Sequence, residues 1–190
     1  LLIKSLSNAG DKVLLASGIT GEEVTARQLL AECYAVAKSL KKLGIKKGDV
    51  ISLVSENRFE FAYVLFGSLL LDVTIAPINL TYSEREMIHA LNLSKPKILF
   101  TSPFASDKVV EVAKSLNFVS KVILFDDENP YGDGSNVTLF EDFKKLSVIS
   151  DEIIPTPVDK INTTAYILCS SGTTGKYLYN NYSISIEITN

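Results

Sequence analysis

The apolar positions along the chain follow two different periods. Between residues 26 and 40 they recur at intervals of three and four, which predicts an amphipathic helix. Thr25 and Gln28 form a capping box in front of this helix, and Gly44 stands in a stop position behind it. Elsewhere, short runs of consecutive apolar residues such as 50–54 are typical of buried strands. The sequence therefore predicts helices and strands in alternation.

The order of these elements predicts the fold class. Further strands are expected at 73–76, 97–101, 121–125 and 164–169, and further helices at 58–71, 83–92 and 107–116. Two more capping boxes, Ser83 with Glu86 and Thr138 with Glu141, are expected to start the helix at 83 and a short helix after 138. Strands separated by helices of this length pair in parallel through right-handed crossovers. We predict a layered α/β domain with a mainly parallel sheet and helices on both faces.

The last part of the chain differs from the rest. A polar loop is expected at 126–135 and a connector at 148–160, and neither has the character of an interdomain linker. From Tyr177 to Asn190 the sequence is first rich in Tyr and Asn and then alternates isoleucine with polar residues. This pattern fits an edge strand or a segment that has no native partner. We divide the chain into a partial domain at 1–176 and a divergent tail at 177–190.

Composition narrows the class of protein. Of the 190 residues, 46% are hydrophobic and 22% are charged, as in a globular protein that buries a core. The formal net charge is -3, from 19 basic and 22 acidic residues, so the chain offers no basic field to a nucleic acid. The most apolar stretch, 61–71, is too short to span a bilayer, and Cys33 and Cys169 lack metal-ligand spacing. We expect an intracellular protein without a transmembrane segment, in a reducing compartment.

One segment carries candidate chemistry. The strand expected at 164–169 runs directly into a stretch of hydroxyl-bearing residues and glycines that ends in a lysine. Glycines let a backbone approach a ligand closely, and free N–H groups and hydroxyls donate hydrogen bonds to phosphate oxygens. The candidate nucleotide-binding residues are Ser170, Ser171, Gly172, Thr173, Thr174, Gly175 and Lys176. An ordinary turn at the end of a strand is the alternative, because the same residue types are common in turns.

Two common motifs do not fit this segment. The P-loop pattern has a glycine five positions before its Gly-Lys pair and a hydroxyl after it, but this chain has Ser170 and Tyr177 in those places. The hydrolase elbow has a serine between its glycines, whereas Gly172 and Gly175 enclose two threonines. His89 is the only histidine and falls on a predicted helix, so Ser-His catalysis is not expected.

Two runs of charged residues could be mistaken for catalytic residues or metal ligands. The Glu-Arg-Glu run at 84–86 opens a predicted helix, where acidic residues cap the positive end of the helix dipole. The Asp-Asp-Glu run at 126–128 lies in a loop, where such a run is usually only solvated. We therefore assign no catalytic residue and no metal ligand.

The segment from Tyr166 to Gly175, with the sequence YILCSSGTTG, resembles the signature of adenylate-forming enzymes. This group includes acyl-CoA synthetases, coumarate-CoA ligases and beetle luciferases. Four motifs upstream are similar to the luciferase and coumarate-ligase branch and occur in the same order, at 55–57 (SEN), 76–79 (APIN), 82–86 (YSERE) and 92–96 (NLSKP). The resemblance covers roughly residues 11–176.

The resemblance implies a fold, an activity and cofactors. The fold is part of the large N-terminal domain of adenylate-forming enzymes. The activity is the ATP-dependent activation of a carboxylic acid, fatty or aryl, followed by transfer of the acyl group to coenzyme A, with Mg²⁺ as a further cofactor. The hydroxyls of Ser170, Ser171, Thr173 and Thr174 are implied to bind the ATP phosphates, while Gly172 and Gly175 shape the backbone. The implied compartment is the peroxisome or the cytoplasm, although the chain carries no Ser-Lys-Leu-type address.

The chain departs from the family pattern after Gly175. Relatives continue with a variable residue and then Pro-Lys-Gly, whereas this chain has Lys176, Tyr177, Leu178 and Tyr179. Leu178 thus occupies the place of the loop lysine. We expect a fragment of such an enzyme, inactive as it stands. The alternatives are a truncated non-catalytic isoform that binds acyl groups or interferes with a full-length partner, and a chain that aggregates because the strand at 164–169 leaves an open sheet edge.

Overall fold

The chain is built of helices and strands in alternation. The computed structural model describes residues 2–132, 135–147, 153, 163–171 and 177–182. The elements within them are α1 (Leu2–Ala9), β1 (Val13–Ala16), β2 (Glu23–Thr25), α2 (Ala26–Lys42), β3 (Val50–Val54), α3 (Phe59–Leu69), β4 (Thr74–Pro77), α4 (Glu84–Ser94), β5 (Ile98–Thr101), α5 (Pro103–Lys114), β6 (Lys121–Leu124), β7 (Val137–Leu139), α6 (Phe140–Lys144), β8 (Tyr166–Ser171) and β9 (Tyr177–Tyr182).

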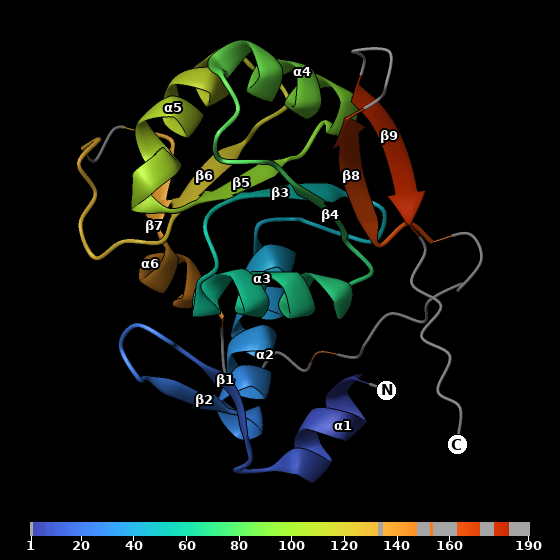
Figure 1. The fold of residues 1–190 in the computed structure, drawn as a ribbon, viewed down its shortest axis with the longest axis vertical. Helices are drawn as coiled ribbons and strands as arrows, with labels where there is room; N and C mark the ends of the chain where they lie inside the picture. Colours follow the sequence, from blue (N-terminus) through green and yellow to red (C-terminus); the bar gives the residue numbers. More distant parts are fainter. Residues whose placement is uncertain (1, 133–134, 148–152, 154–162, 172–176, 183–190) are drawn as a thin grey trace.

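Seven of the strands form one sheet in the order β7-β6-β5-β3-β4-β8-β9 (Figure 1). Neighbours pair in parallel from β7 to β8, and only β9 runs antiparallel to the strand beside it. Helices α4 and α5 cover one face of the sheet, and α2, α3 and α6 lie on the other (Figure 1). The predicted α/β class, with a mainly parallel sheet and helices on both faces, is confirmed.

Alternate side chains of the central strands enter two separate cores. In β5, Ile98 and Phe100 belong to one core and Leu99 to the other, and β6 divides in the same way. All four residues of β5 are buried, as expected for a parallel strand that is covered on both faces. In the core beneath α2, α3 and α6, ring centroids lie 5.1–6.0 Å apart in a cluster of Phe100, Phe125, Phe140 and Phe143.

Two of the three predicted capping boxes are present. At the start of α2, the Gln28 N–H donates to Thr25 Oγ1 at 3.3 Å, and Gln28 Oε1 accepts from the Thr25 N–H at 2.8 Å. Ser83 and Glu86 form the same reciprocal pair at the start of α4. Gly44 follows α2 with a φ of 79°, a left-handed conformation that is typical of a helix end. The boundaries of both helices therefore follow from local sequence.

The third predicted capping box, Thr138 with Glu141, is wrong. Thr138 belongs to β7, where it stands opposite Ile123 of β6, and its hydroxyl accepts a hydrogen bond from Lys121 Nζ at 3.2 Å. Helix α6 begins only at Phe140, and no side chain caps its first turn. Thr138 therefore belongs to a paired strand, although the local sequence pattern predicted that it would cap a helix.

Two further elements differ from the sequence prediction. Helix α5 begins at Pro103 rather than at 107, directly after Ser102, since proline suits the first position of a helix, where its missing N–H is not needed. An antiparallel hairpin, β1–β2, precedes the sheet and forms a sheet of its own. Its strands are only three and four residues long, too short for a clear periodic pattern.

Helices α2 and α3 approach each other closely at Gly67. A Cβ atom at this position would lie 2.8 Å from the carbonyl oxygen of Cys33 and 2.8 Å from Val36 Cβ. Both contacts are on α2, and one of them is backbone, which cannot move aside as the end of a long side chain can. The absence of a side chain at Gly67 therefore sets the distance between the two helices.

We expect Gly67→Ala to lower the free energy of unfolding by on the order of 1 kcal/mol or more, because the clash with α2 exceeds the gain in helix propensity. The measurement is urea unfolding followed by circular dichroism. Gly18→Ala is the matched control, since no atom lies within 4 Å of a Cβ atom built there. Equal unfolding midpoints for the two variants would contradict the close approach.

Candidate functional site

The candidate nucleotide-binding segment lies at the connection between β8 and β9. In the antiparallel register of these strands Ser171 stands opposite Tyr177, so residues 172–176 join them as the connection of a hairpin. A P-loop differs from this arrangement, because it leads from a strand into a helix. Outside the described residues lie Gly172, Thr173, Thr174, Gly175 and Lys176, together with the side chains of Ser170 and Ser171. Their contacts with phosphate stay a prediction.

The first residues of the divergent tail form an edge strand. Tyr177–Tyr182 is β9, and it pairs with β8 over the full length of both strands. Of the two alternatives that the sequence left open for the tail, the structure adopts the edge strand here, while 183–190 lies outside the described residues. Strand β8 has β4 on one side and β9 on the other. The sheet edge that was expected to be open at 164–169 is therefore covered.

The carboxyl end of β4 lies at the same edge of the sheet as the carboxyl end of β8. The two strands are parallel, with Ile75 opposite Tyr166. Their start is fixed by the Thr74 hydroxyl, which donates a hydrogen bond to the carbonyl oxygen of Thr164 at 2.7 Å. Since parallel neighbours deliver their following loops to one edge, the loop after β4 starts at the edge of the sheet where β8 ends.

The loop after β4 is held in place by Lys108 of α5. The Lys108 ammonium donates to the carbonyl oxygens of Leu80 at 3.1 Å and Tyr82 at 2.5 Å. Within the loop, the Asn79 side-chain oxygen accepts hydrogen bonds from the N–H and the hydroxyl of Thr81, both at 2.9 Å. Two of the upstream motifs that resemble the adenylate-forming family, at 76–79 and 82–86, therefore contribute Asn79 and Tyr82 to the structure of this loop.

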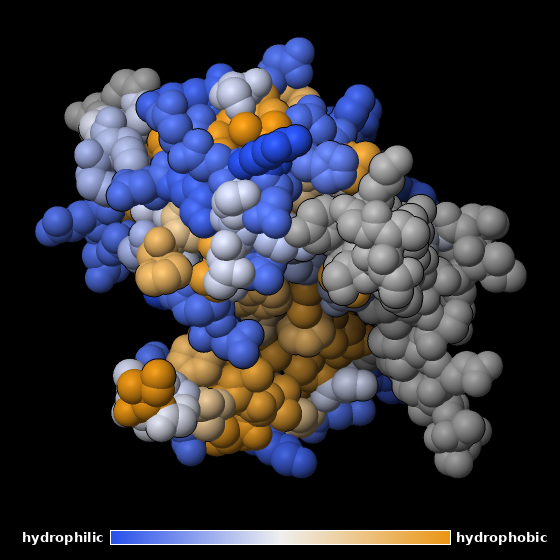
Figure 2. All heavy atoms as spheres, turned by 45° about the horizontal axis from the view of Figure 1, so that its top comes forward, coloured by the Kyte–Doolittle hydropathy of each residue, from blue (hydrophilic) through white to orange (hydrophobic). Residues whose placement is uncertain are grey.

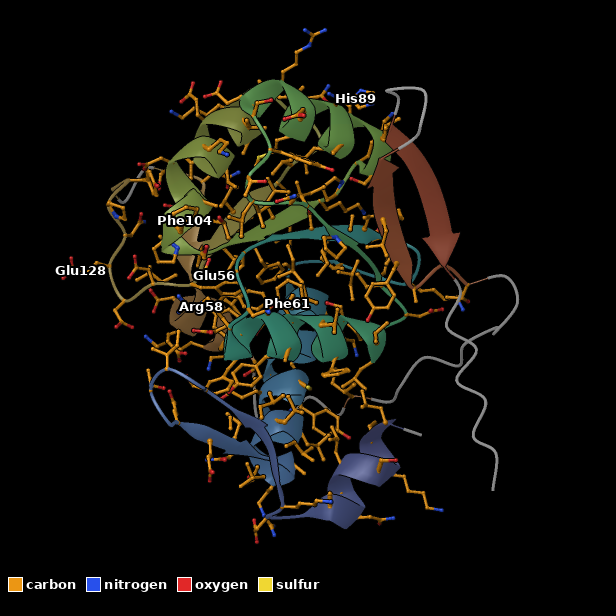
Figure 3. All side chains as sticks on the ribbon, viewed as in Figure 1. Glu56, Arg58, Phe61, His89, Phe104 and Glu128 are labelled. Carbon is orange, nitrogen blue, oxygen red and sulfur yellow. The ribbon has the colours of Figure 1, made fainter. Side chains whose placement is uncertain are left out.

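A second group of polar side chains lies at the carboxyl ends of β3 and β5. Helix α3 follows β3 on one face of the sheet, whereas α5 follows β5 on the opposite face (Figure 1). Such a change of side opens a crevice between neighbouring strand ends, which is where open α/β sheets bind ligands. Glu56, Arg58 and Phe104 lie in this region (Figure 3), and the Phe104 ring is 79% exposed. The Arg58 guanidinium lies 2.9 Å from a carboxylate oxygen of Glu60 and 3.5 Å from one of Glu56.

The carboxylate of Glu56 is kept ionised by its neighbours. Burial pulls its pKa upward, but the nearby Ser102 hydroxyl, a backbone hydrogen bond and the positive charge of Arg58 outweigh burial and hold the pKa below its ordinary value. Glu56 Oε2 and Ser102 Oγ are buried, and neither has a well-aligned hydrogen-bond partner among the described residues. Glu56 is therefore negatively charged at neutral pH.

A groove of about 990 Å³ lies between the β1–β2 hairpin and the starts of α3 and α6. Figure 2 shows the hollow beside the apolar surface of the lower part of the molecule. The Lys144 ammonium in this groove lies 2.8 Å from a carboxylate oxygen of Glu32 and of Glu141, and 5.1 Å from the centroid of the Phe140 ring. Burial and the charges of glutamates around it raise the pKa of the groove residue Tyr63 to about 12.

The described lining of this groove comes from the β1–β2 hairpin, α2, the loop 56–58, the start of α3 and α6. It includes no described residue of β8 or β9. The sequence contained no signal for it, because its five glutamates come from four separate segments of the chain: Glu22, Glu32, Glu56 with Glu60, and Glu141. The fold alone brings them together.

The described residues do not fit a divalent cation. Among them, no group of three or more His, Cys, Asp or Glu side chains is placed to hold a metal ion, so no role is assigned here to Mg²⁺. In the acidic run at 126–128, Asp126 Oδ1 accepts a hydrogen bond from the Asp127 N–H at 2.8 Å, a contact within the loop. His89 is an exposed residue of α4 (Figure 3). None of the helices in the described part of the chain has the length and apolar character needed to cross a bilayer.

We expect Lys108→Met to loosen the loop after β4, because it removes the donor to two backbone carbonyl groups, at a cost of about 1–3 kcal/mol. The measurement is amide hydrogen exchange, with faster exchange between residues 79 and 83 than in the unchanged chain. Lys114→Met is the matched control on the same helix, because its exposed ion pair with Glu111 is 68% and 65% accessible and contributes little. Unchanged exchange in Lys108→Met would show that the loop is held by other contacts.

Comparison with known proteins agrees with this arrangement of elements. Luciferin 4-monooxygenase of Photuris pensylvanica is 32% identical over 164 residues, which cover 86% of this chain and 30% of that protein. The probable 4-coumarate-CoA ligase 3 of Dictyostelium discoideum is 30% identical over 185 residues, which cover 93% of this chain and 34% of that protein. The chain thus spans about a third of the length of these curated relatives.

Solved structures share the fold. The natural red-emitting luciferase from Phrixothrix hirtus superposes with a TM-score of 0.81 at 30% identity, over 95% of this chain and 44% of that chain. A putative long-chain-fatty-acid CoA ligase from Rhodopseudomonas palustris has the same fold, with a TM-score of 0.80 at 19% identity, over 96% of this chain and 43% of that chain. The family described as AMP-binding enzyme matches residues 4–177, and this chain belongs to that adenylate-forming family.

Proposed function

We propose that this chain is part of an ATP-dependent ligase that activates a carboxylic acid as its acyl-adenylate and then transfers the acyl group to coenzyme A. The observation that carries the proposal is the place of the signature, whose described residues form β8 between β4 and β9. Membership of the AMP-binding family and similarity to 4-coumarate-CoA ligases support the same class of reaction. Fatty and aryl acids are the proposed substrates.

The chemistry explains why this segment is rich in hydroxyls and glycines. In adenylation, a carboxylate oxygen bonds to the α-phosphorus of ATP and pyrophosphate leaves, so negative charge is spread over phosphoryl oxygens. A site for this step needs hydrogen-bond donors that are already in place. We assign that role to the hydroxyls of Ser170, Ser171, Thr173 and Thr174. Gly172 and Gly175 are assigned the close approach of the backbone to the phosphates.

One position in this chain weakens the proposed nucleotide site. Leu178, which stands where relatives are expected to have a lysine, is opposite Ser170 in the β8–β9 register. A leucine side chain cannot supply the positive charge that would balance the phosphates. This observation supports a second candidate function, in which the 190-residue chain is not catalytic and binds acyl groups or interferes with a full-length partner.

The experiment that separates the two candidates starts from the native source. Protein is captured with an antibody against residues 11–160, its intact mass is measured, and the captured material is assayed for acid-dependent ATP–pyrophosphate exchange. A species much larger than 20.8 kDa with exchange activity supports the ligase. A species of 20.8 kDa without exchange supports the non-catalytic function, and a large species inactive with every fatty and aryl acid would overturn the ligase proposal.

We expect the purified 190-residue chain to show no pyrophosphate exchange, and we expect Leu178→Lys to bind ATP several-fold more tightly than the unchanged chain. The reason is that a cation opposite Ser170 would attract the phosphates. The measurement is titration with a fluorescent ATP analogue at two salt concentrations. Asn117→Lys, the same charge change at an exposed residue of another loop, is the control. Equal affinities for the two variants would argue against phosphate binding at this hairpin.

A further inference from the structure

The groove between the β1–β2 hairpin and the starts of α3 and α6 concentrates the negative charge of the chain. Its described lining holds five glutamates and two cations, Arg58 and Lys144, so its formal net charge is -3. The whole chain has the same formal net charge of -3. The rest of the chain is therefore neutral on balance, and a positively charged partner is attracted to this groove more than to the remaining surface.

The two cations of the groove do not neutralise the glutamates around them. The Lys144 ammonium lies 2.8 Å from a carboxylate oxygen of Glu32 and 2.8 Å from one of Glu141. Arg58 is shared in the same way between two other glutamates of the lining. Each cation thus has two acidic partners, and the exposed residue Glu22 adds a fifth carboxylate to the lining. The groove keeps an excess of negative charge that a ligand can balance.

The acidic surface continues beyond the groove. A smaller pocket of about 140 Å³ shares four lining residues with the groove and adds Asp126 and Asp127 of the loop after β6. Among the described residues, no group of His, Cys, Asp or Glu side chains is placed to hold a metal ion. A groove of about 990 Å³ with an acidic extension therefore suits an elongated cationic ligand better than a single small cation.

One wall of the groove is a strand with an open edge. Strand β1 belongs to a two-stranded sheet with β2, and no other strand of the described residues pairs with it. Residues 14–16 of β1 all line the groove, whereas no residue of β2 does. Because successive side chains of a strand point to opposite faces, a strand that lines a groove with consecutive residues meets it with its edge. The backbone of β1 can therefore pair with an added strand in the groove.

The same wall also carries exposed apolar side chains. Leu14 is 40% exposed, and Ile19 in the turn of the hairpin is 97% exposed. A ligand that matches the groove thus needs cationic groups, apolar groups and backbone hydrogen-bonding groups. A polyamine has only the cationic groups, whereas an extended peptide that contains lysine or arginine between apolar residues has all three.

The chain itself does not supply such a peptide from its segments outside the described elements. Residues 148–162 and 183–190 together contain four acidic residues and one lysine, so they carry the same sign of charge as the groove. A second copy of the chain has a net negative charge as well. Like charges repel, and the charge of the groove therefore favours a different, basic partner.

We propose that this groove binds an extended basic peptide segment of a partner protein, which adds a third strand to the β1–β2 sheet. Lysine or arginine side chains of the peptide pair with the glutamates of the groove, and the apolar side chains between them lie against Leu14 and Ile19. The backbone of the peptide pairs with the open edge of β1. The proposal does not rest on the ligase activity, because no described residue of β8 or β9 lines the groove.

The test is fluorescence anisotropy of the full 190-residue chain with a labelled ten-residue peptide in which lysine and valine alternate. We expect saturable binding that weakens as salt is added, and roughly tenfold weaker binding to Glu22→Lys, because this change places a cation among the glutamates. Glu23→Lys is the matched control, since Glu23 is the exposed neighbouring residue on β2 and does not line the groove. Circular dichroism checks that both variants are folded.

Two further measurements distinguish strand pairing from general attraction of a polycation. The amides of residues 13–17 are expected to exchange more slowly when the peptide is bound, and the same peptide with N-methylated backbone amides is expected to bind more weakly. Absence of saturable binding would overturn the proposal, and so would an equal loss of affinity in Glu22→Lys and Glu23→Lys. Unchanged exchange at residues 13–17, or equally tight binding of the N-methylated peptide or of spermine, would overturn it as well.

Discussion

Burial of both faces of the central parallel strands is the constraint on which the rest of the structure depends. Strands β3, β5 and β6 send alternate side chains into two cores, so neither face of the sheet can be left to solvent. Each parallel pair needs a crossover connection, and the crossovers supply the helices that cover the two faces. As a result, the loops that follow the parallel strands start at one edge of the sheet. The polar residues after β3, β4 and β5 gather there for that reason.

The same constraint explains why α2 and α3 must lie close together. Helix α3 is apolar on nearly all sides, and a helix of that kind is stable only where most of its surface is covered. Gly67 lets it approach the Cys33 carbonyl and the Val36 side chain of α2, and Gly67 is buried together with Val64 and Ser68. The rest of the helix retains apolar residues that are only partly covered, such as Phe61, Leu65 and Leu69.

Local sequence was sufficient to predict those features that depend on neighbouring residues alone. Helices α2 and α4 with their capping boxes at Thr25 and Ser83 are of this kind, and so is the alternation of strands and helices along the chain. The assignment failed at Thr138, because the competing partner, Lys121, lies on a neighbouring strand and only the fold brings it near. The five-glutamate groove and the Lys108 contact with the loop after β4 were missed for the same reason. Of the candidate site, the sequence identified the segment but not its hairpin connection, which depends on β9.

The register of β8 and β9 shows how a chain of this family can keep the fold while it loses a side chain that is proposed to take part in the chemistry. Strand pairing between the two is made by backbone groups, so Leu178 occupies its position opposite Ser170 as readily as a lysine would. The hairpin that carries the signature is therefore retained, while the charge proposed to act on a bound phosphate is lost with one side chain. A fold does not by itself imply an activity. At residue 178, the backbone atoms contribute to the fold, whereas the side chain bears on the proposed binding of phosphate. The backbone of residue 178 pairs with β8, whereas its side chain carries no charge, so Lys176 is the one cation among the candidate nucleotide-binding residues.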